Sequence, residues 1–541
     1  MGKRGKRPSW RRRFLWLGAG FVLILGMLAV SAYVLAQRIE PYLKDQTAAY
    51  LRNRFNSDLE WSRFQVRMSM TSPLRVLLEK GKGAIVRAEV AGLVLRHRGR
   101  TDIAPLVVMN RVRFEADLSE VLARPAHVRQ ITIEGLQLTI PPKGERPRLS
   151  PSSPSIDEEL AAVEQHAREA QASVIIDRIL ASNTVLRILP RDSRKPPLQF
   201  DIHQLHFDNA AAGSPMIYTA VLDNALPPGR INSKGSFGPW NAAEPGDTPL
   251  DGDYSFREAD LGVFKGIGGI LSSTGNFEGQ LNRIIVDGET DMPQFRLNSG
   301  AASLPLHTKF HAVVDGTNGD TRLEPVEALL NTTRFTAAGS VTRDPKDPAR
   351  SIVLDVVMED GRVEDMLLLA VQANPPMLEG KMNLRMKLEL LPMSGELADR
   401  LRLDGNFELL AASFTSPTVQ EKIDSLSRRG QGQPNQTAIA NVPSDFVGKF
   451  QLEDGRFSVE GLEFDVPGAL VQLDGNYLFG SELLDFHGQL RLQARLSKTM
   501  TGWKRILLTP VDPFFAKEGY GTVLNIKVTG TRDDPQFGLD R

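Results

Sequence analysis

Apolar and polar residues alternate with a period of two along much of the chain after residue 60. Successive side chains of a β-strand point to opposite faces, so this pattern predicts strands with one dry face and one wet face. Parallel strands covered on both sides would be continuously apolar, and these strands are therefore expected to pair antiparallel. The clearest segments are Val112–Leu118, Ile352–Met358, Met382–Leu390, Leu401–Leu409, Val471–Phe479 and Leu484–Leu496.

A strand with a glycine in its middle occurs near both ends of this alternating region. Ile131–Pro141 matches Phe457–Pro467, and Val90–Leu95 is a shorter copy. In both long copies the apolar positions change phase at the glycine, which is Gly135 in one and Gly461 in the other. A glycine bulge produces such a phase change, so the same bent strand is expected at each place, as in a sheet built by repetition.

Helical patterns are few, and most are expected to cap the sheet. A Pro/Ser-rich stretch from 141 to 154, interpreted as a linker or loop, precedes the first of them. The segments with helical spacing are Ile156–Arg168, Phe256–Leu271, Gln420–Arg429 and Lys498–Leu508. For the last segment, contact with a membrane surface or a partner is the alternative to capping. So few helices could not cover a sheet of roughly 25 strands.

A membrane helix is predicted from Phe14 to Ala36, where 23 consecutive residues carry no charge. At about 1.5 Å per residue, this run is long enough to cross a hydrocarbon layer of about 30 Å. Seven basic residues within the first thirteen place the N-terminus in the cytoplasm and the body outside it. The alternative is a cleaved signal peptide, because Val30, Ser31 and Ala32 offer small residues at a cleavage position.

Composition excludes several kinds of chemistry. The chain has no cysteine, which rules out disulfides, thiolate metal sites and cysteine nucleophiles. The 65 basic residues balance the 65 acidic ones, and without the basic N-terminus the body is net acidic. An acidic body offers no general footprint for nucleic acid, and the short cluster Arg96–Arg100 is interpreted as a solvated loop. Nucleotide-binding and hydrolase motifs are missing from the sequence.

Two pairs of histidines and one acidic loop were considered as metal sites. His203 and His206 would point to opposite faces of a strand, while His307 and His311 would share a face about 13 Å apart. Neither pair is therefore expected to share a metal. The loop Asp315–Asp320 lacks the spacing of a helix-loop-helix calcium site and is interpreted as a turn between strands.

The chain resembles the AsmA-like superfamily, which includes TamB. The resemblance rests on the basic tail, the single N-terminal anchor and the repeated one-sided strands. It rests further on the C-terminal stretch Phe446–Arg541, with "DGRFSVEGLEFDVPGALVQLDGNYLFG" and the terminal "GTVLNIKVTGTRDDPQFGL". The resemblance implies a gutter-shaped sheet anchored in the inner membrane and a role in phospholipid movement and envelope integrity. It implies no catalytic residues and no cofactor.

The sequence therefore predicts a mainly β protein: an elongated, repetitive antiparallel sheet shaped as a gutter, with an N-terminal membrane helix and short capping helices. We expect a cytoplasmic tail (1–13), the membrane helix (14–36), an N-terminal β region (37–140), a loop with an acidic helix (141–172), a central β region (173–445) and a C-terminal region (446–541). The candidate groove-lining residues are Met382, Leu384, Met386, Leu388, Leu484, Phe486, Leu490, Leu492 and Leu496.

Two functions are consistent with these patterns. The first is binding or transfer of phospholipid acyl chains between the inner and outer membranes, in support of outer-membrane integrity. The second is a periplasmic scaffold or assembly factor whose strands close into dry sandwiches and which contacts outer-membrane components. The same alternation lines a groove or fills a sandwich, so the sequence leaves both open. No enzymatic activity, metal or cofactor is expected.

Overall fold

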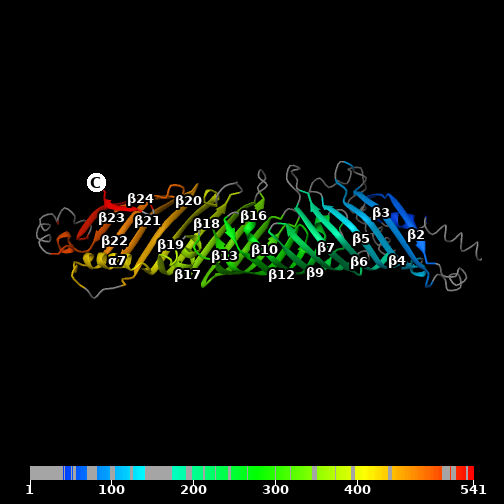
Figure 1. The fold of residues 1–541 in the computed structure, drawn as a ribbon, viewed down its shortest axis with the longest axis horizontal. Coiled ribbons are helices and arrows are strands. Elements are labelled where there is room, and N and C mark those ends of the chain that lie inside the picture. Colours follow the sequence, from blue (N-terminus) through cyan, green and yellow to red (C-terminus); the bar gives the residue numbers. More distant parts are fainter. Residues whose placement is uncertain are drawn as a thin grey trace, which may run out of the picture. The chain divides into compact units, whose positions relative to one another are not determined.

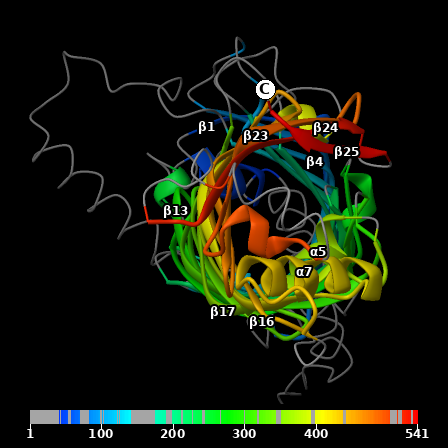
Figure 2. The same cartoon turned by 90° about the vertical axis from the view of Figure 1, so that its left-hand side faces the viewer.

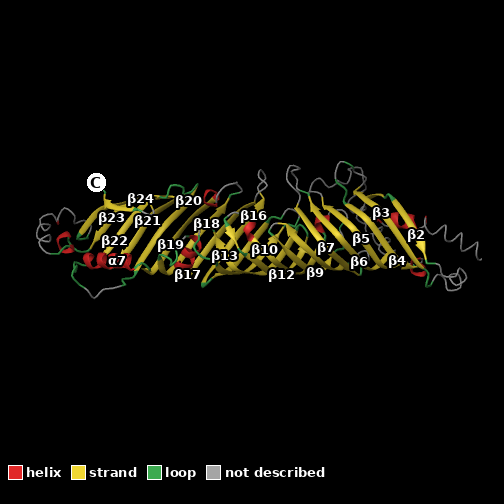
Figure 3. Cartoon of the chain, viewed as in Figure 1, coloured by secondary structure: helices red, strands yellow, loops and turns green. Residues whose placement is uncertain are grey.

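The computed structural model describes residues 41, 43–49, 51–52, 57–69, 82–97, 101, 104–121, 123, 126–140, 174–189, 198–210, 214–225, 227–239, 241, 245–264, 266–298, 300–316, 319–343, 350–371, 373–391, 397–436, 441–501, 512, 519–531 and 534–540. Strands make up 68% of the described residues, among which helices are few and short (Figure 3). The described strands number 25 and belong to a mainly antiparallel β-sheet. The predicted fold class is thus confirmed as mainly β and antiparallel.

The first half of the chain contributes ten strands, α3 (Leu118–Val121) and η1 (Pro245–Asp247). The strands are β1 (Ser57–Glu60), β2 (Arg63–Met68), β3 (Ile85–His97), β4 (Val107–Asp117), β5 (Ala126–Ile140), β6 (Val174–Ile188), β7 (Leu198–Asp208), β8 (Met216–Ala225), β9 (Pro228–Phe237) and β10 (Pro249–Asp260).

The second half contains fifteen strands and the longer helices. The strands are β11 (Ile267–Gly268), β12 (Ile270–Gln280), β13 (Arg283–Leu297), β14 (Leu304–Val314), β15 (Thr321–Leu330), β16 (Thr333–Arg343), β17 (Arg350–Arg362), β18 (Leu378–Leu390), β19 (Leu401–Phe414), β20 (Ser444–Glu453), β21 (Arg456–Val466), β22 (Ala469–Leu478), β23 (Leu483–Leu492), β24 (Thr522–Thr531) and β25 (Pro535–Leu539). The helices are η2 (Leu261–Val263), α5 (Val363–Ala370), α6 (Leu397–Arg400), α7 (Pro417–Gly430) and η3 (Leu496–Thr499).

The described residues divide into two compact units. Unit 1 comprises those of Met1–Asn224, Ile231–Asp253 and Glu278–Asn282, and unit 2 those of Ala225–Arg230, Tyr254–Phe277 and Arg283–Arg541. In unit 2, β13 to β24 follow one another in chain order, each pairing antiparallel with the next (Figure 1). Unit 1 departs from the predicted antiparallel pairing at one place, because β5 and β6 pair parallel.

Three helical connections of unit 2, namely α5, α7 and η3, lie at one end of its strands, whereas α6, between β18 and β19, lies at the opposite end. In an antiparallel run every second strand ends at the same edge. The strands β17, β19 and β23 are followed by α5, α7 and η3 respectively. These three connections therefore lie at the same side of the sheet, where the odd-numbered strands end; we term this row of strand ends the helical edge. The opposite edge, termed the turn edge, carries the turns that follow β20 and β22. This division decides which part of the apolar face the helices can reach.

The bulge predicted at Gly461 is confirmed, whereas Gly135 has the left-handed conformation but no register shift in the pairing of β5 with β4 or β6. Gly92, Gly135 and Gly461 have positive φ angles of 62°, 69° and 58°. At Gly461 the pairing of β21 with β22 shifts register between Val459 and Leu462, and the Asp474 carboxylate accepts a hydrogen bond from the Gly461 N–H at 2.6 Å. A left-handed residue in one strand gives the extra residue that changes the phase, as expected of a bulge.

The helix predictions had mixed outcomes. Gln420–Arg429 is confirmed, since α7 covers it. The helix predicted for Phe256–Leu271 is wrong: β10 continues to Asp260, which caps the short turn η2 by accepting a hydrogen bond from the Gly262 N–H, and Gly266 and Gly269 have positive φ. For Lys498–Leu508, η3 covers the first two residues and 502–508 lie outside the described residues, as does all of Ile156–Arg168.

The predicted membrane helix Phe14–Ala36 also lies outside the described residues. Within the part of the chain that the structure does describe, no helix has the length and apolar character needed to cross a bilayer.

The bulge at Gly461 gives a first testable prediction. A Cβ on this glycine would meet no heavy atom within 4 Å, so substitution there is limited by backbone strain alone. We expect Gly461→Val to destabilise the protein by about 1–2 kcal/mol, because a β-branched residue tolerates positive φ poorly. Gly461→Asn should cost less, since asparagine adopts this conformation more readily. The midpoint of urea-induced unfolding measures both effects.

The matched control is Gly480→Val. Gly480 also has nothing within 4 Å of a built Cβ, but its φ is not positive. Equal effects of valine at 461 and 480 would contradict the strain at the bulge.

Candidate functional site

Cross-strand register aligns one apolar residue of each strand in unit 2 into a continuous row. Starting on β13 and ending on β24, each member lies directly opposite the next. At a strand spacing of about 4.8 Å, the row runs on the order of 50 Å before twist shortens it. We term it the open row; its members are Val286, Ala312, Leu323, Gly339, Leu354, Leu388, Leu403, Leu452, Phe457, Tyr477, Leu484 and Gly530.

The open row is shielded from water only in part. Ala312 and Leu452 are buried, and the other ten members are half-buried. The residues beside them in sequence, such as Asp355, Lys387 and Asp404, are exposed. One face of the sheet is therefore apolar and partly accessible, while the other is charged and wet.

Unit 1 has a corresponding row with a different environment. Seven residues from β2 to β8 lie opposite one another in the same way: Phe64, Val90, Val112, Ile133, Ala181, Leu205 and Ala220. None of these seven exceeds 9% exposure, and all belong to one hydrophobic core. The same alternation thus forms a dry core in unit 1 and a half-open surface in unit 2.

Helices α5 and α7 cover the apolar face of unit 2 near the helical edge. They lie on the inner side of the curved strands (Figure 2). Leu367 of α5, and Ile423 and Leu426 of α7, pack into two clusters on the sheet. These clusters include a second register row, termed the covered row: Met382, Leu409, Phe446, Phe464, Val471 and Leu490.

The covered row and the open row occupy opposite halves of the same strands. On β18 they are represented by Met382 and Leu388, which are about 20 Å apart along the strand. No open-row residue belongs to the clusters beneath α5 and α7. Among the described elements, α5 and α7 therefore cover one half of the apolar face, and the residues of the other half are mostly half-buried.

The nine candidate groove-lining residues divide between these environments. Leu388 and Leu484 belong to the open row, while Met382 and Leu490 belong to the covered row. Met386 and Phe486 are half-buried beside the open row, and Leu384 and Leu492 are buried, the latter in the cluster that includes α7 residues. Leu496 is not on the predicted strand, because β23 ends at Leu492 and Leu496 begins η3.

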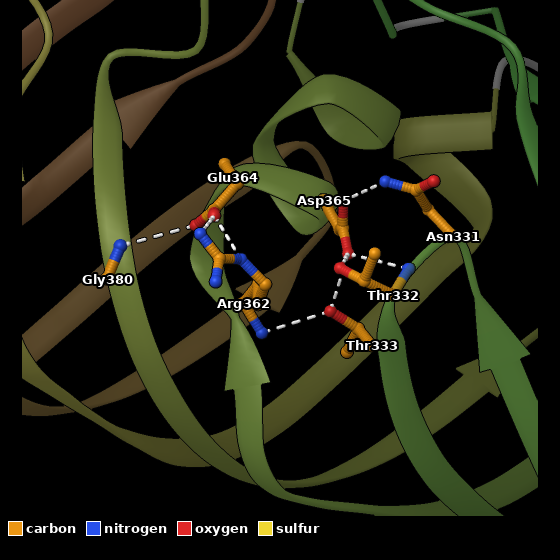
Figure 4. Close-up of polar contacts among 7 residues, drawn as sticks. All are labelled: Asn331, Thr332, Thr333, Arg362, Glu364, Asp365 and Gly380. Atoms are coloured by element: carbon orange, nitrogen blue, oxygen red, sulfur yellow. Dashed lines mark hydrogen bonds and ion pairs between the residues drawn. The ribbon is translucent and has the colours of Figure 1, made fainter.

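A buried carboxylate fixes α5 in place. Asp365, in the first turn of α5, is 2% exposed. It accepts hydrogen bonds from the Asn331 side-chain amide at 2.7 Å, from the Thr332 N–H at 3.2 Å, and from the Thr332 and Thr333 hydroxyls, both at 2.8 Å (Figure 4). The neighbouring Glu364 accepts a hydrogen bond from the Gly380 N–H. The helix is thus tied to the turn between β15 and β16 and to the start of β18.

Two further buried aspartates fix the other two connections at the helical edge, α7 and η3, by accepting hydrogen bonds. Asp424 of α7, 6% exposed, accepts hydrogen bonds from the N–H groups of Asn441 and Val442 at 3.0 and 2.9 Å. Asp512, 5% exposed, accepts from the N–H and hydroxyl of Ser497 in η3 at 2.8 and 2.7 Å. A buried carboxylate that accepts several hydrogen bonds fixes the geometry of the groups around it.

Hydrogen bonding has a larger net effect than burial on the pKa values of Asp365 and Asp424. Burial raises the pKa of Asp365, but the donors Asn331, Thr333 and Thr332 together lower it below its ordinary value. Burial likewise raises the pKa of Asp424, and hydrogen bonds from Val442, Gln420 and Asn441 bring it below its ordinary value. Both carboxylates therefore stay ionised at neutral pH despite their burial.

The polar residues considered as metal sites have other partners. His307 pairs with Asp291, and His311 with Asp287, across β13 and β14. The prediction that His203 and His206 face opposite sides is wrong, because a register shift between Ile202 and Gln204 breaks the alternation and both histidines are exposed.

Asp315–Asp320 joins β14 to β15, as predicted for a turn, with the Asp315 N–H donating to the Asp320 carbonyl at 2.8 Å. Among the described residues, no group of three or more His, Asp or Glu side chains could hold a metal ion.

Comparison of the chain with family models, with curated proteins and with solved structures gives no match.

Sequence reasoning did not find the aspartate ties or the boundary between covered and open rows. The ties join residues between 15 and 34 positions apart, such as Asp512 with Ser497 and Asp365 with Asn331, and no local pattern marks them. The rows can be derived only when the register of every strand pair is known, and each bulge shifts that register by one residue. One usable signal was an aspartate within the apolar helix of residues 363–370, where a buried charge needs partners.

The aspartate tie of α5 gives a second prediction. We expect Asp365→Asn to destabilise unit 2 by about 1–3 kcal/mol, because buried donors lose a charged acceptor. Since the folded-state pKa is lowered, the stabilisation is present above the unfolded-state pKa and disappears as pH falls through the folded-state pKa. The free energies of unfolding of the wild type and the variant, measured with urea, should therefore converge as the pH is lowered through the acidic range.

Asp360→Asn is the control, because the Asp360 side chain is 75% exposed and only pairs with Lys381 at the surface. An equal loss of stability in both variants, or a constant difference at all pH values, would contradict the tie.

Proposed function

We propose that this protein binds phospholipid acyl chains on the open half of the unit 2 apolar face and passes them between two membranes. The observation that carries the proposal is that ten of the twelve open-row residues, on strands from β13 to β24, are only half-buried. Packed interiors exclude water from such residues, as the unit 1 row illustrates in the same chain. An apolar face of this length that keeps contact with solvent is suited to an apolar occupant.

The free energy of occupancy comes from removing apolar surface from water. Each buried CH₂ group contributes about 0.8 kcal/mol. The open row carries an aliphatic or aromatic side chain on every strand from β13 to β23 except β16, and none of its members is charged. Movement along such a row exchanges one apolar contact for another, so it requires no catalytic residue. Leu539 on the last strand, 62% exposed and in register with Ile526, extends the accessible surface to β25.

The sequence supports the location in which this function would operate. The uncharged segment Phe14–Ala36, preceded by basic residues, is proposed to anchor the chain in the inner membrane with its body in the periplasm. The resemblance to AsmA-like proteins carries the same expectation. In this arrangement the gutter would serve phospholipid exchange with the outer membrane and so support its integrity.

Site-specific photo-crosslinking tests the binding. A photoreactive residue in place of Leu403, in the open row, should capture phospholipid in cells, whereas one in place of the neighbouring Asp404 should not, because Asp404 is on the exposed face. Lipid attached to the purified full chain is identified by mass spectrometry. Phospholipid should also co-purify with the unmodified protein after gentle detergent extraction.

Equal capture at 403 and 404 would count against a face-specific site. No capture at 388, 403 or 484, all in the open row, would reject lipid binding and favour the periplasmic scaffold as the function.

The location has its own test. A reporter that is active only in the periplasm, fused after Arg541, should be active, and one active only in the cytoplasm should be silent, because basic residues remain on the cytoplasmic side. The opposite result would overturn the topology. A mature protein that begins near Tyr33 would identify the segment as a cleaved signal.

A further inference from the structure

Three acidic residues on β13 lie opposite three basic residues on β14. Asp287 pairs in register with His311, Glu289 with Lys309, and Asp291 with His307. All six are at alternate positions of their strands, so they share one face of the sheet. We term these three pairs the β13–β14 seam. A histidine side chain carries a positive charge only when it is protonated, so the charge balance across such a set of pairs depends on pH.

Both histidines are in hydrogen-bond contact with their aspartates. His311 Nδ1 lies 2.7 Å from Asp287 Oδ1, and His307 Nδ1 lies 2.8 Å from Asp291 Oδ1. The histidine side chains are 41% and 44% exposed, so solvent protons reach them freely. A neutral imidazole can still donate one hydrogen bond here, but only the protonated ring adds an ion pair.

The charged groups on the neighbouring strand β15 act in the same direction. Glu324 lies opposite His311, with Oε2 3.9 Å from Nε2, and Glu327 lies opposite Lys309. Arg322 also pairs with Glu324 and competes for its charge. Leu329, the partner of His307 on β15, carries no charge. Lys309 and His311 thus lie between acidic residues of both neighbouring strands, whereas His307 lies opposite an acidic residue on β13 alone.

The pKa of His311 follows from this environment. The hydrogen bond to Asp287 raises the pKa above its ordinary value, slight burial opposes it, and the charges of Asp287 and Glu324 raise it further. A raised folded-state pKa stabilises the fold below the unfolded-state pKa, and this stabilisation is lost as pH rises through the folded-state pKa.

Histidine–aspartate pairs of this kind recur on other strands. His127 lies 2.6 Å from Asp177 between β5 and β6, and His203 lies 2.7 Å from Asp223 between β7 and β8. The β13–β14 seam differs from these single contacts because its two histidine–aspartate pairs lie on either side of the Glu289–Lys309 pair.

We propose that the β13–β14 seam is a pH-sensitive element of unit 2, tightened when His307 and His311 are protonated and loosened when they lose their protons. The proposal does not depend on lipid binding. Its consequence is that local opening between β13 and β14, and hence at the start of the open row, becomes more frequent as the pH rises above neutrality.

Hydrogen–deuterium exchange of the full chain at pH about 6 and about 8 tests the proposal. After correction for intrinsic exchange rates, amides of β13 and β14 should be roughly two- to fivefold better protected at the lower pH, as two exposed ion pairs allow. The difference should disappear in the double variant His307→Gln/His311→Gln. It should also shrink in about 1 M salt, where the screening length is about 3 Å.

His206→Gln is the matched control, because His206 is exposed on β7 and takes no part in the seam. Equal protection of wild-type β13 and β14 at the two pH values would overturn the proposal. A pH difference that persists in the double variant would do so as well. If the variant does not fold, the wild-type response to salt decides the question, since a pH difference that is unchanged by salt contradicts an ionic seam.

Discussion

Cross-strand register is the constraint on which the rest of this structure depends. A strand shifted by one residue turns its whole apolar set to the wet face. In unit 2, twelve strands must keep the same phase for the open row to be continuous, and left-handed residues such as Gly461 reset that phase where the sequence departs from strict alternation. The row is therefore a collective property of the pairing, with no single residue essential to it.

Sequence alone predicted the strands well because a period of two has one simple physical cause. It predicted left-handed glycines at positions 135 and 461 from the change of phase, and at Gly461 the pairing also shifts register as in a bulge. It failed at Phe256–Leu271, where leucine, phenylalanine and isoleucine happened to fit helical spacing while Asp260 and two glycines favoured turns. Local spacing could not reveal competition between a short helix and the pairing of β10 and β12.

The apolar face could be predicted, but its covering could not. Leu388 and Leu490 have the same alternating surroundings in sequence, yet Leu490 packs in the cluster beneath α7 and Leu388 does not. The difference arises from buried carboxylates that fix the helices at one edge, through hydrogen bonds between residues distant in the chain. Whether an alternating strand lines a core or a surface thus depends on interactions outside the strand.

Each described strand from β14 to β23 pairs with its neighbours in the chain, and this has a consequence for how such a protein varies and folds. Its energetics resemble those of repeat proteins, in which stability is approximately a sum over units and the interfaces between adjacent units. An inserted hairpin would lengthen the sheet by two strands without altering contacts elsewhere. Because the contacts are local in sequence, assembly can proceed hairpin by hairpin, and fraying can start at an end while the remainder stays folded.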